Sequence, residues 1–306
     1  MLFVTGKGGV GKTTIAAGLA VHAASRGKRV LVGEVDATGT LATAFECGPL
    51  AFQPRQVDDR LWAMAMNTED SLREYLRVYT RVPLVARIGP LARTLDFVAS
   101  AAPGVREILV VGKFCYEVRE RHYDLVIVDA PATGHVVGHL AAPWAINELV
   151  QVGLVRDQTK WMIDILGDPA RTGVVVVTTP EEMPVNETVE LVGRLGAEVP
   201  VSASAVVVNR VLPELFTRDD EAVFDRLRQP AATRRLRELA GEGAERVLDA
   251  AALAVALRRS RADDLSRLDE RLPPGLPLLF VPELFARADG RRVTIKVAAA
   301  LGEEIS

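Results

Sequence analysis

The sequence predicts an α/β protein whose central, mainly parallel sheet is covered by helices on both faces. Three observations predict it. Short, wholly apolar runs recur along the 306 residues, as in strands that are buried on both faces. Stretches with helical periodicity separate these runs. The first run also passes through a glycine-rich turn directly into an alanine-rich stretch that is typical of a helix.

The expected strands follow one another along the chain. The first covers residues 1–5, and the second covers residues 30–36 and ends in a carboxylate, Asp36. A short third strand is expected at residues 61–66. The later strands are expected at residues 125–129, 174–178, 206–209 and 278–281.

Helical segments connect and elaborate this sheet. We expect elaborations at about residues 71–120, 137–168 and 213–272, and a final helix through residues 293–301. The first elaboration includes apolar residues at helical spacing, namely Leu72, Tyr75, Leu76 and Tyr79. Because the chain has no internal repeat and no low-complexity linker, we expect a single domain over residues 1–306.

Charge and hydropathy argue against a nucleic-acid-binding, membrane-bound or secreted protein. The net charge is −3, so nothing favours nucleic acid or an anionic membrane as a partner. No stretch approaches the roughly 18 uninterrupted apolar residues of a spanning helix, and the first strand leaves no room for a signal peptide. We therefore expect a cytoplasmic protein in which Cys47 and Cys115 stay reduced. Arginine outnumbers lysine 31 to 6, which hints at a GC-rich bacterial genome.

The glycine-rich turn predicts a nucleotide site. Gly6, Gly11, Lys12 and Thr13 match the phosphate-loop motif G-x-x-x-x-G-K-[ST] in its strand-loop-helix context. Backbone N–H groups of such a loop converge on phosphate oxygens, and the helix N-terminus adds positive potential. Lys12 would reach the β and γ phosphates, and the Thr13 hydroxyl would join a Mg²⁺ shell. The expected ATP contacts are Gly6, Lys7, Gly8, Gly9, Val10, Gly11, Lys12, Thr13 and Thr14.

Two of the expected strands end in carboxylates. The carboxyl ends of parallel strands lie at one edge of a sheet, where ligands bind, so we expect both carboxylates beside this loop. Asp129 fits a metal-site acid that holds Mg²⁺ through water. Asp36 is a candidate for orienting the attacking water, with a simple loop cap as the alternative. The segment Thr133–His135 could move when the γ-phosphate leaves, as switch segments do.

These residues resemble a known class. Lys7, which follows the first glycine, makes residues 6–13 similar to the deviant Walker A motif of SIMIBI-type phosphate-loop ATPases, the class of ParA, MinD, nitrogenase iron proteins and arsenite ATPases. Within it, Asp129 with Thr133–His135 resembles the second switch of the arsenical-pump and guided-entry ATPases. Further similarities extend to about residue 285, at Asp36, Leu41, Ala44, Phe45, Glu187, Thr188, Val208, Asn209, Arg210, Val281, Pro282 and Glu283.

The resemblance implies a bacterial, single-loop Mg²⁺-dependent ATPase that closes as a dimer around ATP. Lys7 would act across the dimer and, with Lys12 and Asp36, in catalysis. Asn209 would contact adenine, and the loop with Pro282 and Glu283 would cover the base. The partners implied are a second subunit, identical or paralogous, and a client protein such as a hydrophobic helix. Trp144, Trp161 and Met162 would line a client groove or, alternatively, belong to the core.

The departures from the pattern narrow this expectation. Ala37–Gly39 replaces the Pro-Ala-His stretch that follows the first-switch aspartate, which weakens the assignment of Asp36. Without a C-x-x-C or a cysteine near the second switch, we expect neither zinc nor an iron–sulfur cluster. A single phosphate loop means that a dimer needs a second chain. The alternatives are a ParA- or MinD-like positioning ATPase and a metabolic kinase or amidoligase that uses the same loop.

Overall fold

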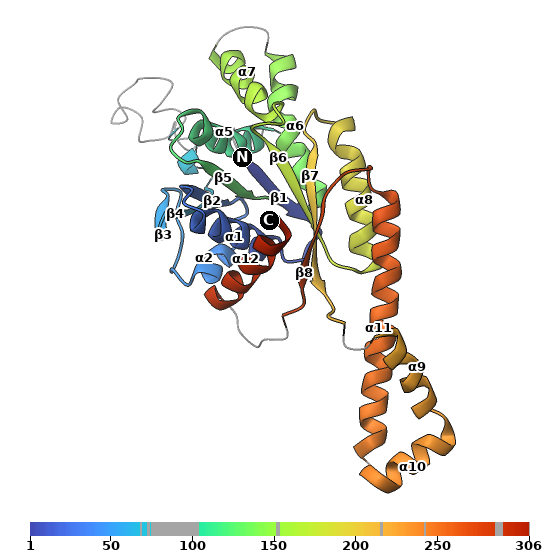
Figure 1. Ribbon diagram of the computed structural model, residues 1–306. Coiled ribbons are helices and arrows are strands. Elements are labelled where there is room, and N and C mark those ends of the chain that lie inside the picture. Colours follow the sequence, from blue (N-terminus) through green and yellow to red (C-terminus); the bar gives the residue numbers. More distant parts are fainter. Residues whose placement is uncertain are drawn as a thin grey trace.

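The computed structural model describes residues 1–67, 69–71, 74, 104–150, 154–214, 217–241, 243–284 and 290–305. These residues form an α/β body with one eight-stranded sheet between two layers of helices (Figure 1). The expected helix through Tyr75, Leu76 and Tyr79, and most of the elaboration at 71–120, lie outside the described residues.

The sheet runs in the order β3-β4-β2-β5-β1-β6-β7-β8, and every strand expected from the sequence is present. The strands are β1 Leu2–Gly6, β2 Val30–Glu34, β3 Arg55–Asp58, β4 Leu61–Ala65, β5 Leu125–Asp129, β6 Gly173–Thr178, β7 Ala203–Val211 and β8 Leu278–Pro282. All neighbours are parallel except β3 and β4. The edge strand β3 has no counterpart among the expected strands, because it is polar and mostly exposed and lacks an apolar run.

Helices connect the strands and close both faces. Within the described residues they are α1 Lys12–Ser25, α2 Thr40–Phe45, α5 Val105–Arg119, α6 Thr133–Leu149, α7 Leu154–Leu166, α8 Glu182–Ala197, α9 Arg218–Leu227, α10 Pro230–Ala240, α11 Gly243–Arg271 and α12 Arg291–Ile305. The elaboration expected at 137–168 is divided into α6 and α7, and α6 begins earlier, at Thr133. The final helix is confirmed as α12 and is longer than expected.

Two apolar cores lie on opposite faces of the sheet. Neighbouring residues of β1 enter different cores, Phe3 under α5, α6 and α8, and Val4 under α1, α2 and α12. This alternation is what strands buried on both faces require. A Cβ on Gly18 would lie 2.7 Å from Val297 Cγ1, so the glycine permits close packing of α1 on α12.

The three side chains expected either in a client groove or in the core pack on the core that contains Phe3. Met162 is buried in it, and Trp144 and Trp161 pack against it while partly buried. Trp161 donates its ring N–H to Gln158 Oε1 at 2.7 Å. These contacts favour the core interpretation for all three residues.

The elaboration at 213–272 forms α9, α10 and α11. The first two helices and the first half of α11 project from the body as a helical arm, whereas the end of α11 packs beside α8, with Leu268 in the core that contains Phe3 (Figure 1). Thr217 and Asp220 form a capping box at the start of α9. A small core of Phe224, Leu248 and Val255 holds the arm helices together. Large apolar side chains remain exposed on the arm, namely Val223, Leu239, Val247, Leu253 and Leu257.

Neither cysteine is bonded to another group through a disulfide. Cys47 is half-buried and Cys115 is buried. Over the described ranges, no group of three or more His, Cys, Asp or Glu side chains is arranged to hold a metal ion. The same ranges contain no helix with the length and apolar character needed to cross a membrane. The expected lack of zinc and of an iron–sulfur cluster stays a prediction.

Candidate nucleotide site

Neighbouring strands and glycines fix the conformation of the loop between β1 and α1. Gly11 has a φ of +94°, a conformation that favours glycine. A Cβ on Gly6 would lie 2.1 Å from the Val177 carbonyl oxygen, so β6 leaves no room for a side chain there. Asn209 is buried and donates from Nδ2 to the Val10 carbonyl oxygen at 2.8 Å. The other expected loop contacts lie at the exposed tip or on the first turn of α1, namely Gly8, Gly9 and Thr14.

The first turn of α1 faces the carboxyl end of β5. Thr13 Oγ1 donates to Asp129 Oδ2 at 2.6 Å. Lys12 Nζ donates to the Lys7 carbonyl oxygen at 3.3 Å. Burial lowers the pKa of Lys12, and the carboxylates of Asp129 and Asp36 oppose this effect. The fold thus brings a cation, a hydroxyl and a carboxylate together at the edge of the sheet where the sequence predicted them.

One oxygen of the buried Asp129 carboxylate has no hydrogen-bond partner among the described residues. Its side chain is 6% exposed, and burial raises its pKa to about 6, with Glu34 and Asp36 adding to the rise and Thr13 and Lys12 opposing it. Oδ1 is buried and has no hydrogen-bond partner among the described residues. A carboxylate oxygen left open beside a hydroxyl is the kind of donor set that hard cations take. The residues therefore fit Mg²⁺, and its coordination by Thr13 and, through water, by Asp129 stays a prediction.

The turn of the first switch is held by Glu34, which was not among the predicted site residues. Asp36 lies just after β2 with its side chain exposed, close enough to Lys12 to affect its pKa. Glu34 is buried and accepts hydrogen bonds from Thr38 Oγ1 at 2.6 Å and from the backbone N–H groups of residues 39–40 at 3.2 and 3.1 Å. A lone carboxylate inside an apolar strand was the signal for it. Glu34 thus holds the turn that carries Asp36.

Lys7 is paired within its own chain. Its Nζ lies 2.5 Å from Oε1 of Glu187, which is on α8. The other oxygen of Glu187 accepts a hydrogen bond from Thr133 Oγ1 at 3.3 Å. The family resemblance included Glu187 but gave it no role. The structure shows that it contacts both the loop and the second switch.

The three residues expected near the base lie at the same edge of the sheet. Asn209 uses its amide on the loop, and its Oδ1 accepts from the Arg210 backbone N–H at 3.0 Å. Pro282 ends β8 with its side chain exposed, and the Glu283 N–H donates to the Val211 carbonyl oxygen at 2.8 Å. Contact of Asn209, Pro282 or Glu283 with a base stays a prediction.

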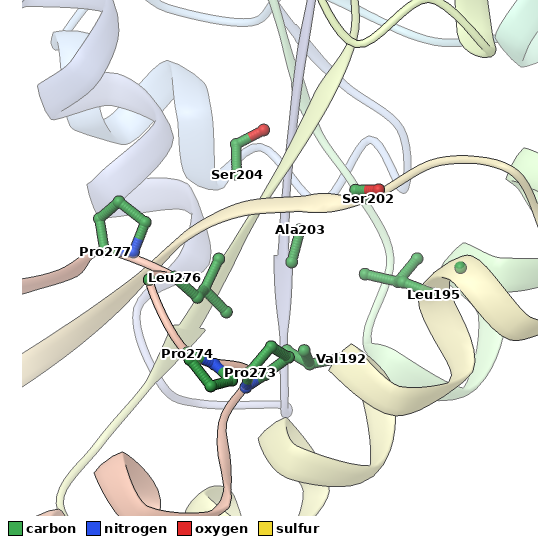
Figure 2. A pocket seen from close by; sticks show the side chains of 11 residues that line it. Val192, Leu195, Ser202, Ala203, Ser204, Pro273, Pro274, Leu276 and Pro277 are labelled. Carbon is green, nitrogen blue, oxygen red and sulfur yellow. The ribbon is translucent and has the colours of Figure 1, made fainter.

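A pocket of about 410 Å³ lies elsewhere, at the amino ends of β7 and β8 (Figure 2). Figure 2 shows it between the end of α8, at Leu195, and the turn through Pro273 and Leu276. Its lining is apolar apart from Ser202 and Ser204, and no charged side chain contributes to it. It gathers none of the predicted site residues, which lie at the opposite edge of the sheet.

Comparisons with known proteins match the chain to a family of ATPases. The family described as anion-transporting ATPase matches residues 1–162 and 145–240. ATPase BagA of Mycobacterium tuberculosis is 33% identical over 230 residues, which cover 72% of this chain and 67% of the relative. The arsenical pump-driving ATPase of Acidiphilium multivorum is 27% identical over 242 residues, 72% of this chain but 40% of the relative. The ATPase ASNA1 homolog of Entamoeba dispar is 25% identical over 251 residues, 69% of this chain and 76% of the relative.

Proposed function

The chain belongs to the anion-transporting ATPase family and is an ATP hydrolase, and from this premise we propose that it is a Mg²⁺-dependent ATPase that closes as a dimer around nucleotide. The observation that carries the proposal is the meeting of Lys12, Thr13 and Asp129 at one edge of the sheet. A fixed cation, a loop of backbone N–H groups and an open carboxylate are the parts that phosphoryl transfer needs.

Each residue has a distinct part in this proposal. The loop amides and Lys12 bind the phosphates and spread their negative charge. Thr13 and Asp129 would hold Mg²⁺, which neutralises phosphate charge when bound. Asp36, exposed at the turn held by Glu34, orients the attacking water. Asn209, Pro282 and Glu283 border the place for the base.

Dimer closure explains the exposed side of the loop. Gly8 and Gly9 present bare backbone to solvent, so a second chain can approach the phosphates there. Lys7 would then reach the phosphates held by the partner, as a second cation beside a transferring phosphoryl group. The partner is a second copy or a paralogue of this chain.

We propose that the switch binds and releases a client protein in the cytoplasm. The name of the Acidiphilium multivorum relative describes an ATPase that drives a pump, which is coupling of ATP hydrolysis to another protein. Exposed Leu239, Val247 and Leu253 on the arm are compatible with a protein partner. The idea fails if no host protein copurifies with the Asp36→Asn chain in Mg-ATP beyond what copurifies with Lys12→Ala.

Two substitutions test the site directly. Lys12→Ala should reduce nucleotide binding by about a hundredfold or more, because it removes the half-buried cation that would contact the phosphates. Asp36→Asn should leave binding within about threefold of wild type and lower hydrolysis by about a hundredfold, because it removes only the group that orients water. Fluorescent-nucleotide binding and phosphate release measure the two effects.

Matched controls for these variants lie on the surface. Lys28→Ala and Asp59→Asn change the same side-chain types at exposed turn positions and should leave both measurements unchanged. Hydrolysis at the wild-type rate by Asp36→Asn would refute the first-switch assignment. Unchanged nucleotide binding by Lys12→Ala would refute the site itself.

A further inference from the structure

One carboxylate, that of Glu187, joins three elements around the nucleotide site. It accepts Lys7 of the phosphate loop on Oε1 and Thr133, the first residue of α6, on Oε2. Glu187 itself lies on α8, which packs against α6 and β1. The side chains of Lys7 and Glu187 are 27% and 33% exposed, so the pair lies at the surface of the body.

This pairing competes with the catalytic use of Lys7. The ammonium group of Lys7 lies 2.5 Å from a carboxylate oxygen of Glu187 and forms a charge-assisted hydrogen bond with it. To reach a phosphate on another chain, the Lys7 side chain has to leave Glu187. A phosphate supplies the same kind of partner, an anionic oxygen, with more charge. Nucleotide on the facing chain can therefore replace Glu187 as the partner of Lys7.

We propose that Glu187 is a positioning residue that holds Lys7 and Thr133 in the single chain and releases Lys7 when two chains close around nucleotide. The inference rests on the proposed dimer and adds to it a contact that opposes closure. When the Lys7 side chain moves away, Glu187 no longer has a cation beside it, and the Thr133 hydroxyl then donates to an unpaired carboxylate. Closure is thereby communicated to the start of α6.

The contact acts as a bias and not as a lock. A pair with partly exposed side chains is screened by water, and such pairs change an equilibrium by about fivefold or less. Breaking it should therefore lower the nucleotide concentration needed for closure by about two- to fivefold. It should not make the nucleotide-free chain dimerise.

The first experiment tests the pair in the nucleotide-free chain. Urea unfolding is measured for wild type, Lys7→Ala, Glu187→Gln and the double variant. We expect the two substitutions to couple by about two- to fivefold in the unfolding equilibrium constant. Glu190→Gln is the matched control, because Glu190 is an exposed carboxylate on the same helix, and it should be additive with Lys7→Ala. Additivity of Glu187→Gln as well would overturn the proposal.

The second experiment tests release. Sedimentation velocity follows dimer formation as a non-hydrolysable ATP analogue with Mg²⁺ is added to wild type, Glu187→Gln and Glu190→Gln. Glu187→Gln should shift the midpoint to an analogue concentration about two- to fivefold lower, and Glu190→Gln should match wild type. Coupling in urea with an unshifted or raised midpoint would overturn the release step alone. A wild-type chain that binds the analogue and stays monomeric would instead refute the proposed dimer.

Discussion

At the scale of single residues, the site is built around a carboxylate that the fold holds at a cost. Asp129 is almost fully buried, and one of its oxygens has no hydrogen-bond partner among the described residues. Thr13 and Lys12 compensate only part of the desolvation. Buried polar groups without partners are uncommon in folded proteins and often mark functional positions. The unsatisfied oxygen is what makes this place suitable for a cation.

That cost predicts a pH dependence of stability in the nucleotide-free chain in EDTA. The pKa of Asp129 is raised from 3.8 to about 6, so the folded chain favours the protonated form. Stability from this group is therefore present below pH 4 and is lost as the pH rises to 6. Relative to wild type, Asp129→Asn should gain up to about 2 to 3 kcal/mol in the free energy of unfolding between pH 4 and 7 and nothing further above it.

Urea unfolding of the two proteins at half-unit pH steps measures this difference, since other titrating groups cancel between them. A difference that stays flat from pH 4 to 7 would show that Asp129 is not strained by burial. With Mg-ATP added at pH 7, the order should reverse, because the wild-type carboxylate then has its cation.

At the scale of elements, the phosphate loop depends on a strand far away in sequence. Asn209 on β7 supports the loop by its bond to Val10, and its amide occupies the space that a Cβ on Gly11 would need. The loop conformation is thus fixed by tertiary contact as much as by its own glycines. This contact gives Asn209 a structural part beside the one expected near adenine.

The two parts of Asn209 make different predictions. If it supports the loop, Asn209→Ala leaves a buried carbonyl oxygen without its donor and should cost about 1 to 2 kcal/mol of stability. Affinity for ATP and GTP should then fall by a similar factor. A change in the ATP-to-GTP preference with unaltered stability would contradict support and favour adenine contact. Gln53→Ala, which removes an exposed side-chain amide away from the loop, is the control for both measurements.

Elements with strong periodicity were predictable from the sequence, and contacts between elements were less so. The buried strands and the loop before Lys12 carry local signals, an apolar run and a motif with fixed spacing. The edge strand β3 carries none, because its polar residues need no core. The Lys7–Glu187 pair joins positions 180 residues apart, so no local pattern announces it. Glu34 had a local signal, a carboxylate in an apolar strand, but its role follows only from the hydrogen bonds that it accepts from residues 38–40.

At the scale of the whole molecule, the body and the arm have different surfaces. The body buries its apolar residues in two cores on the faces of the sheet, whereas the arm has only a small core and exposes large apolar side chains. At the edge of the sheet where the nucleotide site lies, the body exposes the backbone of Gly8 and Gly9 and part of the Lys7 side chain. In our proposal one chain therefore holds an incomplete site, because the phosphates bound to one chain are contacted by Lys7 of the other chain.

The most direct measurement mixes two inactive variants, Lys7→Ala and Asp36→Asn, in equal amounts and follows phosphate release. If Lys7 acts across the dimer and Asp36 within its own site, each mixed dimer has one intact site. Random pairing should then restore about a quarter of the wild-type rate per chain. Each variant alone should stay inactive at the same total concentration. A mixture that stays as inactive as its components would contradict the shared site.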